Sequence, residues 1–215
     1  YTFAIAERIK PQGKVLSIDL DNLAIEHARE EIQRLKIKNI ILVNENFKNL
    51  SKIVTQSFTK QQLNPKFNGI IFDLGLASAQ LQDINRGFSF QSDTTLNMNF
   101  SQINEDRSTS TEDIVNNYGL VDLTRIFQLY GEEKFAKTIA KKIIIARQNL
   151  PIKTTGQLVD IIKNAIPKKY RYGSLHPATK IFQALRIATN DELDNLRSAL
   201  PQTLNLLAAG GKLAV

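Results

Sequence analysis

The sequence predicts an α/β protein in which a doubly wound parallel sheet is interrupted by a helical, basic insertion. Short β-branched and apolar runs alternate with a helical pattern in the first part of the chain. Between Gln82 and about Asn190 the pattern is helical without strand signals, and a strand pattern returns at the end. We therefore expect a sheet domain over residues 1–82 and 190–215 and an insertion over residues 83–189.

The composition of the chain excludes several classes of protein. Its 215 residues are 42% hydrophobic and 23% charged, as in ordinary globular proteins. No apolar run approaches the ~18 residues of a membrane span and no signal-peptide pattern is present, so we expect a cytoplasmic protein without a membrane partner. Cysteine is absent and there are two histidines, so we expect neither a disulfide nor a metal site.

Two strands with a helix between them are predicted near the start of the chain. The run KVLSIDL (14–20) has the β-branched, apolar character of a parallel strand and ends on Asp19. Asp21 can cap the following helix, which we expect to continue to about residue 37 because apolar residues recur there at helical spacing. The run NIILV (39–43) then predicts the next strand.

Two further strands complete the predicted sheet. FNGIIFDLG (67–75) is an apolar run that Gly75 terminates, and AAGGKLAV (208–215) has a helix stop followed by a strand start. The opening segment TFAIAERI resembles a helix that follows a first strand, and the sequence stops in mid-strand. We therefore expect a fragment of a longer protein.

The insertion is predicted to be helical throughout. Apolar residues recur three or four apart over residues 109–118, 120–150 and 154–167, which predicts one helix in each range. Thr154 and Gln157 have the spacing of a capping box at the start of the third helix.

Positive charge is concentrated in the insertion. From Lys134 to Arg186 there are twelve Lys or Arg against one acid, Asp160, so this stretch carries +11 and the rest of the chain −4. Such a one-sided block favours a polyanionic partner, because neutralising phosphates releases counterions. The alternative is a solubilising surface, although such surfaces usually intersperse both signs.

Three side chains are candidates for a site at the carboxyl ends of the strands, where open parallel sheets bind ligands. Asp19 can accept hydrogen bonds from the two ribose hydroxyls of an adenosine, or it can merely start the next helix. Phe47 can lie against an adenine ring, or it can be a core residue. Asp73 follows an apolar run, where a buried carboxylate implies a ligand or a polar network, unless it caps a turn.

The two histidines are ambiguous. His27 lies in a predicted helix, where a solvated side chain is the simplest interpretation. His176 precedes Pro177 inside the basic block, so it is either a substrate contact or a turn residue.

Four segments of the chain resemble a known family. Residues 73–100, DLGLASAQLQDINRGFSFQSDTTLNMNF, are similar to its signature DLGVSSPQLDDxxRGFSFxxDGPLDMRM. YGEEKFAKTIAKKI, HPATKIFQALRIATNDEL and LLAAGGKLAV are similar to YGEERFARRIARAI, HPATRTFQALRIxVNxEL and LLAPGGRLAV. The family is the RsmH (MraW) family of bacterial small-subunit rRNA cytosine-N4 methyltransferases, and the resemblance runs nearly end to end in the same order.

The resemblance implies a fold, a reaction and a set of cofactor residues. The fold is the Rossmann-like sheet of class I S-adenosylmethionine-dependent methyltransferases with an inserted helical domain. The reaction moves a methyl group from S-adenosyl-L-methionine to N4 of a cytosine in 16S rRNA, near the decoding site of the small ribosomal subunit. Four residues match positions that the family associates with the cofactor: Asp19, Phe47, Asp73 and Gln80.

The chemistry of the target base suggests further roles. The lone pair of the cytosine amine is delocalised into the ring, so Asp73 or the carbonyls beside it are candidates to accept the amine hydrogens. Flipped bases stack on aromatic or Arg planes, which gives candidate roles to Arg86, Phe88 and Phe90 unless these are core residues. The other candidates for contact with RNA are Lys137, Lys141, Lys142, His176 and Arg186.

The sequence departs from the family pattern at several points. The GGGGHS loop and the SFHSLED segment are not in this sequence, Ala77 and Ala79 replace Ser and Pro, and TTLNMNF replaces GPLDMRM. These departures keep a second hypothesis in view, a noncatalytic rRNA-binding relic. A third hypothesis, an NAD-dependent oxidoreductase, depends on Asp19 alone. The oligomeric state, with a homodimer as one alternative, is undecided by the sequence.

Overall fold

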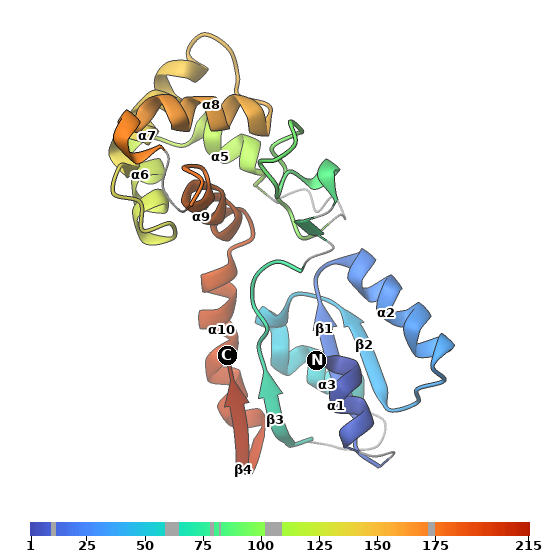
Figure 1. Ribbon diagram of the computed structural model, residues 1–215. Coiled ribbons are helices and arrows are strands. Elements are labelled where there is room, and N and C mark those ends of the chain that lie inside the picture. The colour runs from blue at the N-terminus through green and yellow to red at the C-terminus, as the bar shows by residue number, and fades with distance from the viewer. Residues whose placement is uncertain (10–11, 59–64, 78–79, 82, 102–108, 172–174) are drawn as a thin grey trace. The chain divides into compact units, whose positions relative to one another are not determined.

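The computed structural model describes residues 1–9, 12–58, 65–77, 80–81, 83–101, 109–171 and 175–215. The chain divides into two compact units (Figure 1). Unit 1 contains residues 1–74, 100–103 and 193–215, and unit 2 contains residues 75–99 and 104–192. The functional division into a methyltransferase core and an RNA-binding insertion stays a prediction, and its boundary residue Gln82 lies outside the described residues.

Unit 1 is built on two pairs of parallel strands. Strand β1 (Val15–Asp19) pairs with β2 (Ile40–Asn44) in unbroken register, from Val15 opposite Ile40 to Asp19 opposite Asn44. Strand β3 (Phe67–Ile71) pairs with β4 (Leu207–Ala214). Among the described residues, ladder hydrogen bonds join strands only within these pairs, so β1 and β3 each keep one unpaired edge.

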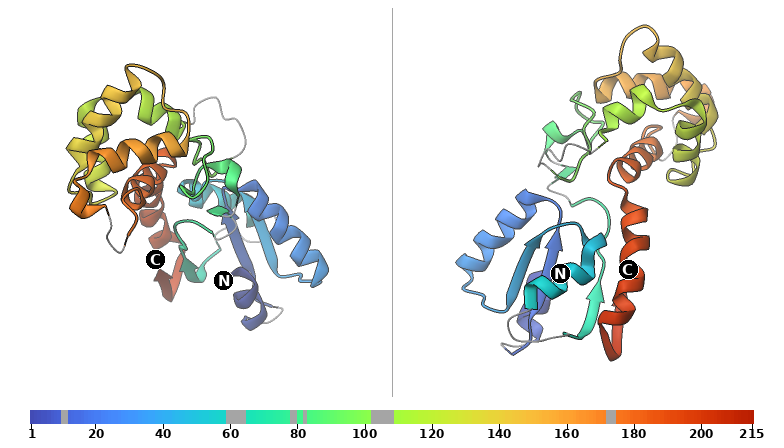
Figure 2. Two further views of the ribbon diagram at one scale, coloured as in Figure 1. Left: turned by 45° about the horizontal axis from the view of Figure 1, so that its top comes forward. Right: turned by 180° about the vertical axis from the view of Figure 1, so that it is seen from behind.

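Helices cover the strands of unit 1. They are α1 (Thr2–Arg8), α2 (Asn22–Arg34), η1 (Phe47–Asn49), α3 (Leu50–Phe58) and α10 (Glu192–Leu206). Helices α1 and α3 lie on opposite faces of the strands (Figure 2). A core cluster of Leu50, Val54, Phe72 and Ala199 joins α3 and α10 to the strands.

The last strand begins earlier than expected and is irregular. The strand start predicted after the glycines is wrong in detail, because α10 ends at Leu206 and β4 starts at Leu207. Phe67 lies opposite Leu207 and Gly69 opposite Lys212, so the residues between Leu207 and Lys212 bulge from the ladder. Gly210 has φ +77°, a conformation that suits glycine in such a bulge.

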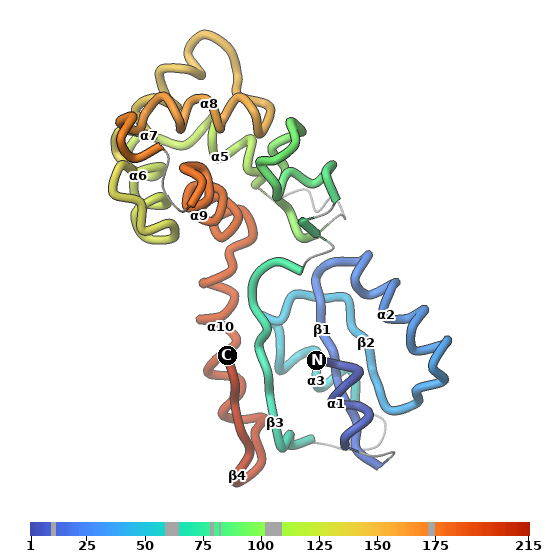
Figure 3. Tube along the Cα trace, in the orientation of Figure 1, coloured from blue at the N-terminus to red at the C-terminus, as the bar shows by residue number. Residues whose placement is uncertain are grey.

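Unit 2 is helical. Its helices are η2 (Ile84–Arg86), α5 (Thr111–Asn117), α6 (Leu120–Leu129), α7 (Ala136–Arg147), α8 (Thr155–Ala165), η3 (Lys168–Tyr170) and α9 (Thr179–Thr189), and Figure 3 traces their order. Phe127, Ile139, Leu158 and Leu185, from four different helices, have no exposed surface and form its core. The predicted capping box of Thr154 and Gln157 is confirmed. No helix in the described part of the chain is long and apolar enough to cross a membrane.

The single helix expected over residues 120–150 is wrong, because the chain turns between α6 and α7. Gly131 is packed so closely that an added Cβ would lie 2.6 Å from the carbonyl oxygen of Lys180 and 2.9 Å from that of Phe127. Glu132 has φ 47°, a left-handed conformation that ends the helix. Periodicity missed this break because apolar residues keep helical spacing on both sides of it.

Candidate functional site

Three of the four predicted cofactor residues lie at one edge of unit 1. The carboxyl ends of β1, β2 and β3 face the same edge (Figure 1). Asp19 is the last residue of β1, Phe47 follows the end of β2, and Asp73 follows the end of β3. This is the edge at which open parallel sheets bind ligands. Gln80, the fourth, belongs to unit 2.

Asp19 holds the turn after β1 and keeps an exposed side chain. Its Oδ1 accepts a hydrogen bond from the backbone N–H of Asp21 at 2.8 Å. Asp21 is the residue that starts the helix, since its Oδ1 accepts from the N–H of Leu23 at 3.1 Å, as the sequence predicts. Asp19 does not itself cap the helix, and its role toward a ligand stays a prediction. Asp19 is instead an exposed acid that the turn holds in place.

Two asparagines that the sequence interpretation missed shape the same edge. The side-chain amide of Asn44 donates to the carbonyl oxygens of Asp19 at 2.9 Å and Leu20 at 3.1 Å. The Oδ1 of Asn46 accepts from the N–H of Lys48 at 2.9 Å and so caps η1. The signal was present in VNENF, where polar residues directly follow an apolar strand.

Phe47 belongs in part to the core. Its ring centre lies 5.5 Å from that of Phe72 at an interplanar angle of 65°, an edge-to-face contact. The ring packs against the cluster of Leu50, Val54, Phe72 and Ala199 but is only half-buried. Packing in the core therefore explains only the buried part of the Phe47 ring.

Asp73 is exposed, which corrects the argument from burial. Phe72 is 9% exposed and donates its backbone N–H to the carbonyl oxygen of Ala214 at 2.9 Å, so the ordered chain continues past β3. Ile71 is 50% exposed and Asp73 is exposed as well. The expectation of a carboxylate that burial forces to find a partner is wrong. What the structure provides is an exposed acid directly after a core residue.

Gln80 stabilises its own loop. Its Oε1 accepts a hydrogen bond from the backbone N–H of Ala77 at 2.9 Å. This bond fixes the chain at Ala77, one of the two alanines that replace Ser and Pro of the family pattern. The other, Ala79, lies outside the described residues.

The RGFSF segment of unit 2 is largely structural. Arg86 is 7% exposed and Phe88 is 5% exposed, and the guanidinium carbon of Arg86 lies 5.2 Å from the Phe88 ring centre. Nη2 of Arg86 donates to the carbonyl oxygen of Asn99 at 2.9 Å. Gly87 has φ +72°, and a Cβ there would lie 2.2 Å from the carbonyl oxygen of Thr95. Burial of Arg86 and Phe88 favours the core alternative for both.

Phe90 and His176 form a half-buried aromatic pair. Their ring centres lie 4.6 Å apart at an interplanar angle of 16°, and Phe182 contacts Phe90 edge-on at 5.3 Å. His176 Nδ1 accepts from the N–H of Ala178 at 3.2 Å. Burial, with a smaller contribution from Lys163, lowers the pKa of His176, which favours the neutral ring near pH 7.

The predicted basic contacts fall into two groups. Arg186 is held by Glu192 through two hydrogen bonds, Nε to Oε1 at 2.6 Å and Nη2 to Oε2 at 3.1 Å. Its guanidinium is therefore committed to an internal ion pair. Lys137, Lys141 and Lys142 are exposed on α7 and form no ion pair with any described residue.

Comparison with known families identifies the chain. A model of the MraW methylase family matches residues 2–215. The chain belongs to the MraW methylase family. It is therefore an S-adenosylmethionine-dependent methyltransferase, and both the family resemblance and the predicted α/β fold class are confirmed. This assignment sets aside the oxidoreductase hypothesis.

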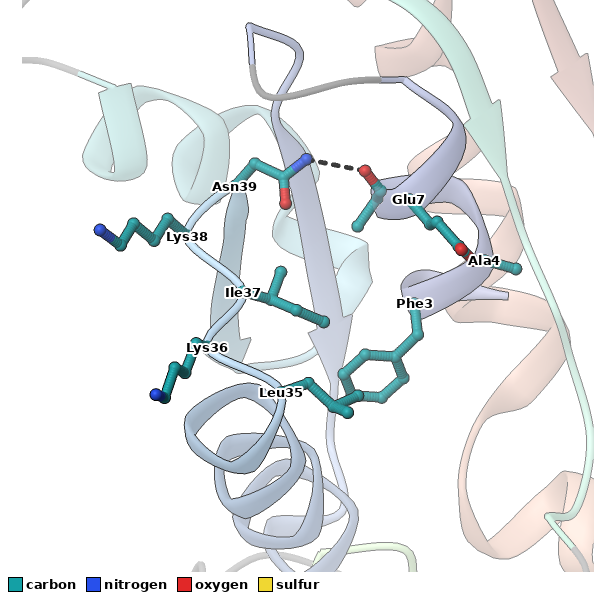
Figure 4. A pocket seen from close by; sticks show the side chains of 9 residues that line it. Phe3, Ala4, Glu7, Leu35, Lys36, Ile37, Lys38 and Asn39 are labelled. Atoms are coloured by element: carbon teal, nitrogen blue, oxygen red, sulfur yellow. Dashed lines mark hydrogen bonds between the residues drawn. The ribbon is translucent and has the colours of Figure 1, made fainter.

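A pocket of about 810 Å³ in the methyltransferase lies away from the candidate cofactor edge. Phe3 and Glu7 of α1 and Leu35, Ile37 and Asn39 of the segment before β2 contribute to its wall (Figure 4). The side-chain amide of Asn39 donates to the carbonyl oxygen of Ala6 at 2.8 Å and ties the two segments together. Because this segment precedes β2, the pocket is at the amino ends of the strands and does not serve the cofactor edge.

Proposed function

We propose that this methyltransferase transfers the methyl group of S-adenosylmethionine to N4 of a cytosine in 16S rRNA, near the decoding site of the small ribosomal subunit. The observation that carries the proposal is the edge of unit 1, where Asp19 ends β1 and Phe47 and Asp73 follow the ends of β2 and β3, in a chain of the MraW methylase family. A cytoplasmic location, where ribosomes work, goes with this function.

The residues at this edge suit the adenosine half of the cofactor. The exposed carboxylate of Asp19 is anchored through Oδ1 to the Asp21 N–H, so an acceptor for ribose hydroxyls is already oriented. Phe47 has one side in the core and is half-exposed, as a residue that contacts an adenine would be. Gln80, which belongs to unit 2, orders its own loop, and its role toward the cofactor remains what the family resemblance implies.

Asp73 is proposed to position the target amine. S-adenosylmethionine supplies an electrophilic methyl group when bound. The cytosine amine must turn its lone pair toward that group, and it does so best when acceptors hold its two hydrogens. An exposed carboxylate at the end of β3 can accept one or both of these hydrogen bonds. The negative charge of Asp73 also favours the positive charge that develops on the amine during transfer.

The basic face of α7 is proposed to bind the rRNA. Lys137, Lys141 and Lys142 are exposed and form no ion pair with the described residues, so their ammonium groups are available to phosphates. They lie within the stretch from Lys134 to Arg186 that contains only one acid. We expect the triple change to Glu to reduce the salt slope of rRNA binding by roughly one unit per lost phosphate contact.

The second candidate function is rRNA binding without methyl transfer. It is favoured by Ala77, which replaces a serine of the family pattern and offers no side-chain hydroxyl, so that it bonds to the described loop through its backbone N–H and carbonyl oxygen alone. This candidate predicts the same salt-dependent binding but no product.

One experiment tests the proposal and separates the two candidates. The full-length natural protein is incubated with unmethylated small-subunit particles and methyl-deuterated S-adenosylmethionine, and digested rRNA is examined by mass spectrometry. Labelled N4-methylcytidine supports methyl transfer. Tight binding of the particles without labelled product supports the binding relic, and label at another atom contradicts the proposed target.

A further inference from the structure

A group of lysine and aromatic side chains in unit 2 lies at the start of α7 and in η3. We define the lysine–tyrosine cluster as Lys134, Phe135, Lys169 and Tyr170. The Nζ of Lys134 lies 3.7 Å from the centre of the Tyr170 ring, and the Nζ of Lys169 lies 4.9 Å from it. The ring of Phe135 lies 5.3 Å from that of Tyr170, centre to centre. Two ammonium groups and two rings thus occupy one small surface.

Hydrogen bonds donated by backbone N–H groups hold the two segments that carry the cluster. Glu133, which is 9% exposed, accepts from the N–H of Phe135 through Oε1 at 2.8 Å and fixes the start of α7. Tyr170 is the last residue of η3 and donates its N–H to the carbonyl oxygen of Pro167 at 2.9 Å. The cluster is therefore presented by an ordered surface, as a binding site requires.

The charges of the cluster are not neutralised within the described chain. Lys134 and Lys169 are exposed and form no ion pair with a described acid. The ammonium group of Lys180 contacts the chain two residues before Lys134, since its Nζ donates to the carbonyl oxygen of Glu132 at 3.0 Å. Like charges around one ring repel each other, and a bound phosphate would relieve that repulsion.

We propose that the lysine–tyrosine cluster binds a single-stranded segment of the RNA substrate. Lys134 and Lys169 turn from the Tyr170 ring to neutralise consecutive phosphates, and Tyr170, which is 43% exposed, then stacks on a neighbouring base. An acidic protein would satisfy the lysines but would make no use of the rings, so RNA fits the cluster better. The inference rests on the proposed function, because it assigns a second contact to the same substrate.

The test measures binding of the full chain to a fluorescent oligouridine of about 12 nucleotides, a length in the range that single-strand sites cover. Changing Lys134 and Lys169 to Gln should weaken binding about tenfold and lower the slope of log affinity against log salt by about 1.4, since each single-strand phosphate contact contributes about 0.7. Tyr170→Leu should weaken binding by a similar factor through lost stacking, with the salt slope unchanged.

The matched control changes two exposed lysines of unit 1, Lys38 and Lys52, to Gln, which removes the same charge elsewhere. Affinity and slope should then stay near wild type. Equal losses in the control and the cluster variant, or wild-type binding by Tyr170→Leu, would overturn the inference. If methylcytidine forms but the cluster variants bind normally, the inference alone fails. If the variants lose binding but no methylcytidine forms, the proposed reaction fails and the cluster stands.

Discussion

The two units bury their cores to different degrees. Of the twelve largest fully buried side chains among the described residues, eleven lie in unit 2 and only Ile53 lies in unit 1. No residue of β1, β2, β3 or β4 is fully buried. Parallel strands are normally covered on both faces, whereas helices satisfy their own hydrogen bonds and can pack in pairs. Unit 2 therefore has the more completely buried core, and the sheet that presents the cofactor edge is the less covered part.

Hydrogen exchange should show this contrast most strongly. Amides of α7, α8 and α9 should be protected about a thousandfold more than amides of β1 and β3, because local opening costs least where few side chains are buried. Native-state exchange read by mass spectrometry of peptides from each unit is the measurement. Equal protection in both units would remove the basis of the comparison.

A matched pair of isoleucines tests the contrast by mutation. Ile139 of unit 2 has no exposed surface, so Ile139→Ala should destabilise that unit by about 2–5 kcal/mol through lost burial and a cavity. Ile70 of β3 is half-buried, so Ile70→Ala should cost unit 1 only about 1 kcal/mol. Urea unfolding, followed by exchange in peptides of each unit, gives both values. A larger loss for Ile70 would show that the sheet is better packed than its burial indicates.

The stability of unit 2 should depend on pH through His176, which is a smaller effect than the two above. Burial lowers the pKa of His176 in the folded protein, so its contribution to stability is present above the ordinary histidine value of about 6.5 and is lost as pH falls through the lowered pKa. Protonation would also break the hydrogen bond that Nδ1 accepts from Ala178. His176→Phe should keep the stack on Phe90 and reduce the loss of unit 2 stability on acidification.

The control for this pH effect is the other histidine. His27 is exposed in α2 of unit 1, so His27→Gln should leave the pH dependence of unit 2 unchanged. Thermal unfolding at a series of pH values from 7 downward gives the comparison, with hydrogen exchange in peptides of unit 2 as the readout. An identical acid slope in wild type and His176→Phe would mean that another group titrates there.

Local chemistry was predictable from the sequence, but packing was not. The Asp21 cap and the Thr154 capping box follow from side chains that bond to their own neighbours, so short-range reasoning found them. The break at Gly131 depends on the carbonyl oxygen of Lys180, which is distant in sequence and leaves no local signal. Burial of Arg86 against Phe88 depends on a similar long-range fit.

For the candidate site too, local features were predictable from the sequence and burial was not. A polar residue at the end of an apolar strand indicated Asp19 and Asp73, and the structure brings them to one edge. Exposure of Asp73 could not be predicted, because the sequence does not show how completely the strands are covered. The lysine–tyrosine cluster could not be predicted for a related reason: Lys134 and Phe135 are more than thirty positions away from Lys169 and Tyr170 in the sequence.

The most direct test of the account is single-turnover methylation of small-subunit particles by the full-length natural protein with Asp73 changed. Asp73→Asn should lower the rate by about 100-fold and Asp73→Ala by more, with unit 1 still folded, because a positioned acceptor acts chiefly in the transition state. Glu30→Gln, which removes a charge from the exposed face of α2, should keep the wild-type rate. A near wild-type rate for Asp73→Ala would contradict the account and place the acceptor of the amine hydrogens elsewhere.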